Sequence, residues 1–96
     1  MTALIMDDHA LPGGDLIHAG LEDLARGIES QQALLVAIGA PRLRRVGVPV
    51  PDHPFTSPEH RLYHRLARTN PDAAHARYNA LIRRLVSFER AAECAR

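Results

Sequence analysis

Histidine is the residue type in this chain with the widest range of chemistry, and two of the six histidines have a suggestive spacing. His60 and His64 stand four residues apart in a segment predicted to be helical, so both side chains can point the same way, as in helical metal-binding pairs. The sequence supplies no third ligand at a fixed spacing, and histidines are also common at the boundary between an apolar and a charged helix face. We therefore predict no metal site and no cofactor.

Side chains that could act as nucleophiles lack the sequence context that such chemistry needs. Ser30 and Ser57 stand where helix caps are expected, Ser87 lies inside a predicted helix, and no Gly-x-Ser-x-Gly elbow is present. Cys94 is the single cysteine; Arg90 precedes it by one helical turn, but no histidine is close to it in sequence. A lone cysteine excludes an intramolecular disulfide, which agrees with a reducing cytoplasm. These observations favour a protein without catalytic activity.

Arginines are the residues best suited to bind an anion. All 12 basic residues are arginine, whose planar guanidinium binds carboxylate or phosphate through two hydrogen bonds. Arg61, Arg65 and Arg68 are spaced four and three residues apart and therefore share one helix face, which suits non-specific contact with the phosphates of a nucleic acid. Aromatic residues for base stacking are few. A solvated basic face, partly paired with acidic side chains, is the reading that we favour.

The segment Arg68-Thr69-Asn70-Pro71-Asp72-Ala73-Ala74-His75 resembles the Arg-x(4–6)-His motif of HEPN-type helical ribonucleases. The resemblance implies a small four-helix bundle, usually dimeric, in a family with many members in bacterial toxin–antitoxin pairs. It further implies that Arg68 contacts the scissile phosphate and that His75 acts as general acid or base, without a metal, in a site shared by two subunits. The similarity covers eight residues, and Thr69 stands where the family usually has Asn, Asp or His.

The first half of the chain contains signals for two helices behind a loop-forming tail. Residues 1–14 end in Leu-Pro-Gly-Gly and are predicted to be a flexible tail. Asp15 is the expected cap of a first helix, and Ser30 that of a second helix over residues 31–38. Gly39 is a natural terminator for the second helix.

A short helical turn and a stiff connector are expected next. Pro41 is suited to open a turn that runs to Val46. Three prolines between Val48 and Pro54 then predict an extended connector rather than a strand, because proline fixes its own backbone and constrains the residue before it.

Two further helices begin with the same pattern of a capping residue, a proline and an acid. Ser57-Pro58-Glu59 predicts a third helix that runs to about Thr69, and Asn70-Pro71-Asp72 predicts the start of the last and longest one. The fold class is therefore all-α: a small bundle of about four helices with a short extra turn and a Pro-rich connector, forming a single domain over residues 15–96.

The last helix has the cleanest apolar periodicity in the chain, with spacings of four and three that are typical of a coiled-coil seam or of a bundle helix. Its stripe comprises Ala74, Tyr78, Leu81, Leu85, Phe88, Ala92 and Ala95. A central place in the bundle explains this stripe, and so does a dimer interface. For an interface, the candidate residues are Tyr78, Leu81, Leu85 and Phe88.

Composition and charge bound the functional classes that remain. The chain has 96 residues, with two Phe, two Tyr and no Trp. None of its apolar stretches approaches the length of ~20 residues that a membrane helix needs. Residues 1–40 carry a net charge of −5 and residues 41–96 one of +6, from 11 arginines against five acids. We expect a cytoplasmic, self-associating or partner-binding regulatory protein, such as a toxin–antitoxin component. The alternatives are an RNA-cleaving site at Arg68 and His75 and non-specific nucleic-acid binding.

Overall fold

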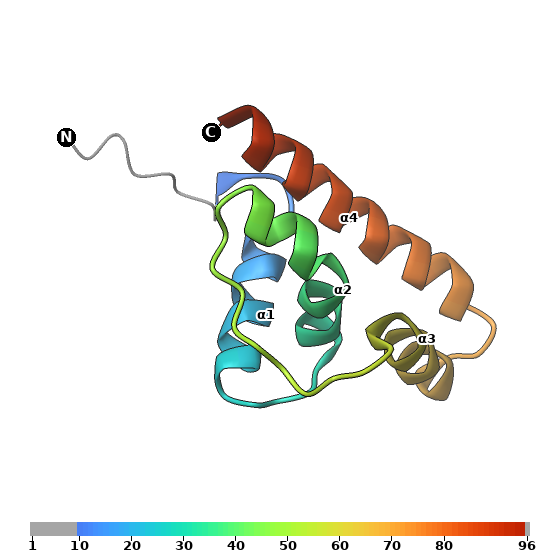
Figure 1. The fold of residues 1–96 in the computed structure, drawn as a ribbon. Coiled ribbons are helices and arrows are strands. Elements are labelled where there is room, and N and C mark those ends of the chain that lie inside the picture. The colour runs from blue at the N-terminus through green and yellow to red at the C-terminus, as the bar shows by residue number, and fades with distance from the viewer. Residues whose placement is uncertain (1–9, 96) are drawn as a thin grey trace.

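The computed structural model describes residues 10–95 and contains four helices in this part of the chain (Figure 1). They are α1 (Gly14–Ala25), α2 (Gln31–Arg45), α3 (Pro58–Thr69) and α4 (Ala74–Ala95). No strand occurs among the described residues, so the all-α prediction is confirmed. Helices α1 and α2 pack side by side, α4 runs along α2, and α3 lies across the first half of α4 (Figure 1).

The pairing of α1 with α2 depends on a very close approach at Gly20. This glycine is buried, and a Cβ atom at its position would collide with the carbonyl oxygen of Gln32 and, at 2.5 Å, with Val36 Cγ2. Real Cβ atoms essentially never come so near to other heavy atoms. The absence of a side chain at Gly20 therefore sets the distance between the two helices.

The turn between these helices is held by a small polar cluster around Asp23. The predicted cap of α2 is confirmed, since Ser30 Oγ accepts a hydrogen bond from the backbone N–H of Ala33 at 3.1 Å. The same hydroxyl donates to Asp23 Oδ2 at 2.6 Å, and Gln32 Nε2 donates to that oxygen at 3.0 Å. One carboxylate near the end of α1 thus fixes the start of α2.

Helix α2 does not end at Gly39, so the predicted terminator and the separate turn after Pro41 are wrong. The helix continues through both residues to Arg45, because Ala40 and Leu43 bury their side chains in the core and favour continuation. Gly39 serves close packing, since a Cβ there would lie 2.8 Å from Leu85 Cδ1. Pro41 removes one backbone hydrogen bond, but its ring lies on the exposed side of the helix.

Two predicted caps also differ from the structure. The N-cap of α1 is Gly13, not Asp15, with φ of 74° and no side-chain hydrogen bond. A Cβ at Gly13 would lie 2.9 Å from the carbonyl oxygen of Arg84 on α4, which accounts for glycine there, and Asp15 instead pairs with Arg84 at 3.4 Å. Ser57 occupies the N-cap of α3, yet its side chain accepts no capping hydrogen bond.

The start of α4 lies a little later than the sequence predicts. Asn70 Oδ1 accepts a hydrogen bond from the backbone N–H of Ala73 at 3.3 Å, as expected of a cap, but residues 71–73 form a turn. The helix proper begins at Ala74. Of the predicted tail, residues 1–9 lie outside the described residues, whereas Leu11 packs against the core and Gly14 already belongs to α1.

The hydrophobic core forms where α2 meets the other three helices. Most of the stripe predicted for α4 is buried in it, together with Leu62 and Leu66 of α3, whereas Ala95 is exposed and Tyr78 half-buried. The buried hydrophobic residues of α3 and α4 are Leu62, Leu66, Ala74, Leu81, Leu85, Phe88 and Ala92. Five consecutive residues of α2, 33 to 37, are also buried, so this helix occupies the centre of the fold.

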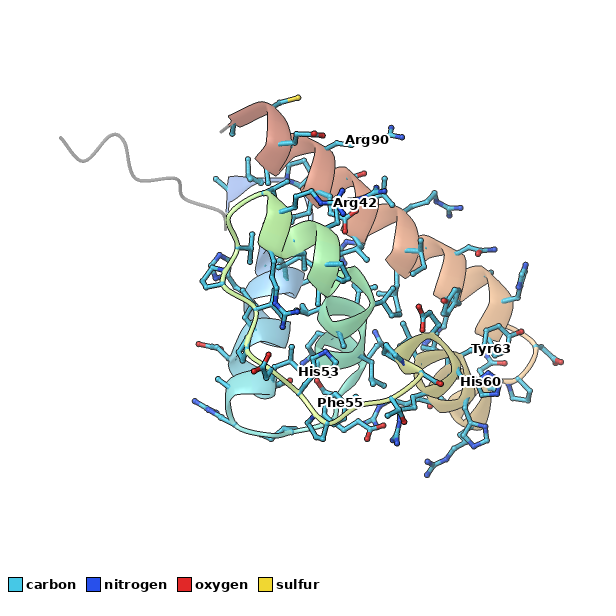
Figure 2. All side chains as sticks on the ribbon, viewed as in Figure 1. Arg42, His53, Phe55, His60, Tyr63 and Arg90 are labelled. Carbon is cyan, nitrogen blue, oxygen red and sulfur yellow. The ribbon has the colours of Figure 1, made fainter. Side chains whose placement is uncertain are left out.

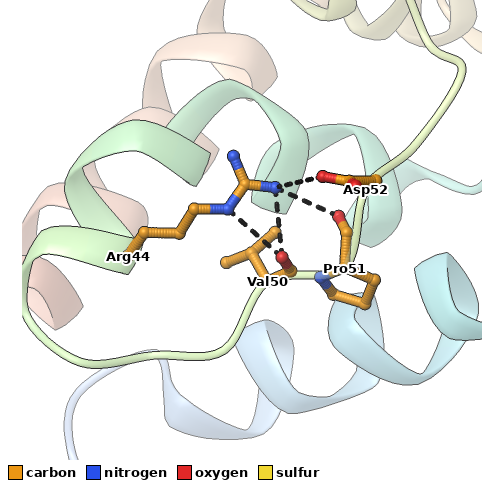
Figure 3. Close-up of polar contacts among 4 residues, drawn as sticks. All are labelled: Arg44, Val50, Pro51 and Asp52. Atoms are coloured by element: carbon orange, nitrogen blue, oxygen red, sulfur yellow. Dashed lines mark hydrogen bonds and ion pairs between the residues drawn. The ribbon is translucent and has the colours of Figure 1, made fainter.

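The Pro-rich connector forms neither a helix nor a strand, as predicted, and is attached to the bundle by Arg44. Arg44 Nε and Nη2 donate to the carbonyl oxygen of Val50 at 3.2 and 3.1 Å, and Nη2 lies 3.3 Å from that of Pro51 and 3.6 Å from Asp52 (Figure 3). The side chains of Val48 and Val50 are buried in the core. This one guanidinium satisfies carbonyl groups that have no helical or strand partner.

We expect Arg44→Met to lower the free energy of unfolding by about 1 to 2 kcal/mol, because two carbonyl groups lose a charged hydrogen-bond donor. Urea unfolding followed by circular dichroism measures this. Arg45→Met is the matched control, since Arg45 is also exposed in the last turn of α2 but has no contact of this kind with the connector. Equal losses in the two variants would mean that the attachment contributes nothing beyond the general effect of a cation at the helix end.

Candidate functional sites

The four residues predicted to form a dimer interface lie largely in the core of the single chain. Leu81, Leu85 and Phe88 are 8, 3 and 0 % exposed, and Tyr78 alone of the four reaches the surface. Their spacing of four and three is that of a bundle helix packed against its own neighbours. Any surface through which this chain contacts a second protein must therefore be made largely by other residues.

Arg68 and His75, the pair indicated by the HEPN-like motif, are both exposed on either side of the turn between α3 and α4. The ring of His75 lies 6.4 Å from that of Tyr63, and its Nε2 lies 3.2 Å from Asn79 Nδ2. Arg68 lines a small hollow of about 280 Å³ with Arg65 and Thr69. The ribonuclease reading stays a prediction.

The arginine face of α3 is less free than its spacing indicates. Arg61 pairs with Glu29 at 3.1 Å and donates to the carbonyl oxygen of Thr56 at 2.8 Å, so it ties α3 to the loop before α2. Arg65 and Arg68 remain as exposed guanidinium groups. Two neighbouring cations can neutralise only a few phosphates of a nucleic-acid backbone, which favours weak binding at most.

His60 and His64 do not belong to a cluster of metal ligands. Within residues 10–95, no group of three or more His, Cys, Asp or Glu side chains is placed to hold a metal ion. Cys94 is exposed near the end of α4. The two histidines instead line a groove beside α4.

This groove is the first of two hollows on the surface that are lined by side chains suited to binding, and we call it the tyrosine face. It has a volume of about 450 Å³ and lies between α3 and α4; Figure 2 labels Tyr63 and His60 on its α3 side. The rings of Tyr63 and Tyr78 lie 5.7 Å apart. Its lining residues are Glu59, His60, Tyr63, His64, Ala67 and Tyr78. Partial burial, together with the negative charge of Glu59, raises the pKa of the Tyr78 hydroxyl.

The second feature is a cleft of about 690 Å³ between the carboxyl-terminal ends of α2 and α4, which we call the arginine cleft. Its lining residues are Arg42, Arg45, Val46, Gly47, Glu89, Arg90 and Glu93. At its base the Glu89 side chain is 6 % exposed, and its Oε1 lies 3.7 Å from Arg42 Nη1. Burial raises the pKa of the Glu89 carboxyl, and the positive charge of Arg42 offsets part of that rise.

Glu89, which is not among the candidate residues named from the sequence, lies within the buried surface of α4. A signal for this was present, because Glu89 follows Leu85 by four residues and precedes Ala92 by three. Its Oε2 lies over Gly39, where a Cβ atom would come within 3.0 Å of it. The missing side chain on α2 thus leaves room for a carboxyl group between the helices. Buried ionisable groups beside a cleft are common at functional sites.

Comparisons of the chain with protein-family models, with curated protein sequences and with solved structures give no significant match. Among the described residues, none of the helices combines the length and apolar character required to span a membrane. The geometry of the two surface features is therefore the basis for a functional argument.

We expect Glu89→Gln to raise the free energy of unfolding at neutral pH, because it removes a charge from a buried position while keeping the shape of the side chain. The lost partner, Arg42, is 64 % exposed, so the ion pair itself contributes little. A raised carboxyl pKa means that the folded chain binds this proton more tightly than the unfolded chain does. The stability gained from this tighter binding is complete below the pKa of Glu89 in the unfolded chain, and it declines as the pH rises through the pKa of Glu89 in the folded chain.

The advantage of the glutamine variant should therefore disappear in acid, and urea unfolding at two pH values measures this. Glu93→Gln is the matched control, because Glu93 is exposed on the same helix and should change little at either pH. A variant of Glu89 that is less stable than the wild-type chain at neutral pH would contradict the argument.

Proposed function

We propose that this chain is a small protein-interaction module that self-associates through its tyrosine face. The observation that carries the proposal is Tyr63, which is 40 % exposed and lies against Tyr78 beside an open groove. Exposed apolar surface that lines a groove is a feature of interaction sites, and tyrosine is enriched among the residues that contribute most to binding at the centres of protein interfaces.

The charges around this face favour a second copy of the chain as the partner. In a two-fold dimer a residue of one copy meets a different residue of the other, and the reverse contact follows by symmetry. Glu59 and His64 line the same groove, so each carboxylate can meet an imidazole of the other copy. The neighbouring face with Arg65 and Arg68 offers no such match, because two copies would bring like charges together.

Light scattering after size-exclusion chromatography tests the proposal with two substitutions of the same kind. The wild-type chain is expected to show the mass of a dimer, and Tyr63→Ala is expected to show the mass of a monomer, with an unchanged helical circular dichroism spectrum. Ile28→Ala is the matched control, because Ile28 is the other large hydrophobic side chain exposed among the described residues, at 45 %, and lies outside the tyrosine face. Its dimer should persist.

Two results would overturn this proposal. A monomeric wild-type chain at every concentration would remove self-association. A dimer that survives Tyr63→Ala but dissociates in Ile28→Ala would move the interface to the loop between α1 and α2.

A further inference from the structure

The arginine cleft holds three guanidinium groups from two helices at one end of the molecule. Arg42 and Arg45 come from the last turns of α2 and Arg90 from α4; Figure 2 labels Arg42 and Arg90 at this end. Two of the cations lie near the carboxyl end of α2, where the helix dipole favours positive charge. That explanation does not extend to Arg90, which lies before the last turn of α4.

These guanidinium groups are largely free for a ligand. Arg44, the residue before Arg45, bonds to the connector, but Arg45 and Arg90 take part in none of the ion pairs found in the described part of the chain. Arg42 meets Glu89 at 3.7 Å, longer than the 2.7–2.9 Å of a charge-assisted hydrogen bond. Three arginines thus line one cleft, and the only ion pair among them within residues 10–95 is the long contact of Arg42 with Glu89.

We propose that the arginine cleft binds a small organic oxyanion, that is, a molecule with a phosphate or carboxylate group held by Arg42, Arg45 and Arg90. Guanidinium groups match both anions through pairs of parallel hydrogen bonds. The cleft volume of about 690 Å³ lies within the range of roughly 300–1,000 Å³ found for small-molecule sites, so it has room for a body larger than the anionic group.

Glu89 gives the cleft a link between anion binding and protonation. When the anion engages Arg42, the carboxylate of Glu89 loses its nearest positive charge and faces a negative one. The neutral form of Glu89 avoids this repulsion and can donate a hydrogen bond to the anion. The charged groups around it are Arg42 and Arg45 on α2 and Arg90 and Glu93 on its own helix. Binding should therefore favour the protonated form of Glu89 and be accompanied by proton uptake from solvent.

Calorimetric titration with sulfate, inorganic phosphate and citrate tests the site, with chloride used to keep the ionic strength constant. At least one of these oxyanions should bind with a stoichiometry of one per chain. Arg90→Gln should weaken that binding by roughly tenfold or more, because a charged hydrogen-bond donor is lost. Arg83→Gln is the matched control, since Arg83 is exposed on the same helix and does not line the cleft. It should leave the affinity unchanged.

The proton link has its own readout. Sulfate stays a dianion over the accessible pH range, so its affinity for the wild-type chain should increase as the pH falls, whereas its affinity for Glu89→Gln should change much less. Absence of oxyanion binding, or equal losses in Arg90→Gln and Arg83→Gln, would overturn the proposal. Tighter binding of a short oligonucleotide than of any small oxyanion, with the same dependence on Arg90, would replace it with a nucleic-acid contact. Tyr63→Ala should bind oxyanions normally, which separates this test from that of self-association.

Discussion

The fold depends on the close packing of one helix, α2, against its neighbours on both sides. Two glycine contacts make this possible: Gly20 of α1 lies against the backbone of α2, and Gly39 of α2 lies under side chains of α4. Interiors are packed so tightly that added atoms in such places force the surroundings apart. With α2 held from both sides, α4 is positioned along it, and α3 is positioned by α2, by α4 and by the ion pair of Arg61 with Glu29.

Both surface features follow from this arrangement. The arginine cleft lies where α2 and α4 end side by side, and Glu89 fits between them because Gly39 presents no side chain. The tyrosine face lies where α3 crosses the first half of α4. The two proposed activities therefore lie at opposite parts of the same long helix, and α4 forms one wall of each site.

Local signals in the sequence predicted local structure well. Ser30 caps α2 as expected, because capping involves residues only three positions apart, and Pro58 and Pro71 lie at helix starts or in the turn before one. The prediction that α2 ends at Gly39 was wrong because a glycine that allows close packing and a glycine that ends a helix cannot be told apart in the sequence. Periodicity likewise indicated that Leu85 and Phe88 are buried, but a bundle core and a dimer seam have the same period. The cleft was not predictable, since its residues come from two helices more than 40 positions apart in the chain.

The polar cluster around Asp23 also bears on the order in which the chain assembles. Its three side chains lie within ten residues of one another, so the turn and the two flanking helices can form with little loss of loop entropy. Helix α4 reaches α2 only after a much longer loop closes. The short closure favours early formation of the α1–α2 pair, on which α3 and α4 then dock. Local opening of the folded chain should then begin at α3 and α4, which form the tyrosine face and one wall of the arginine cleft, and this gives both features conformational freedom while the α1–α2 pair stays intact.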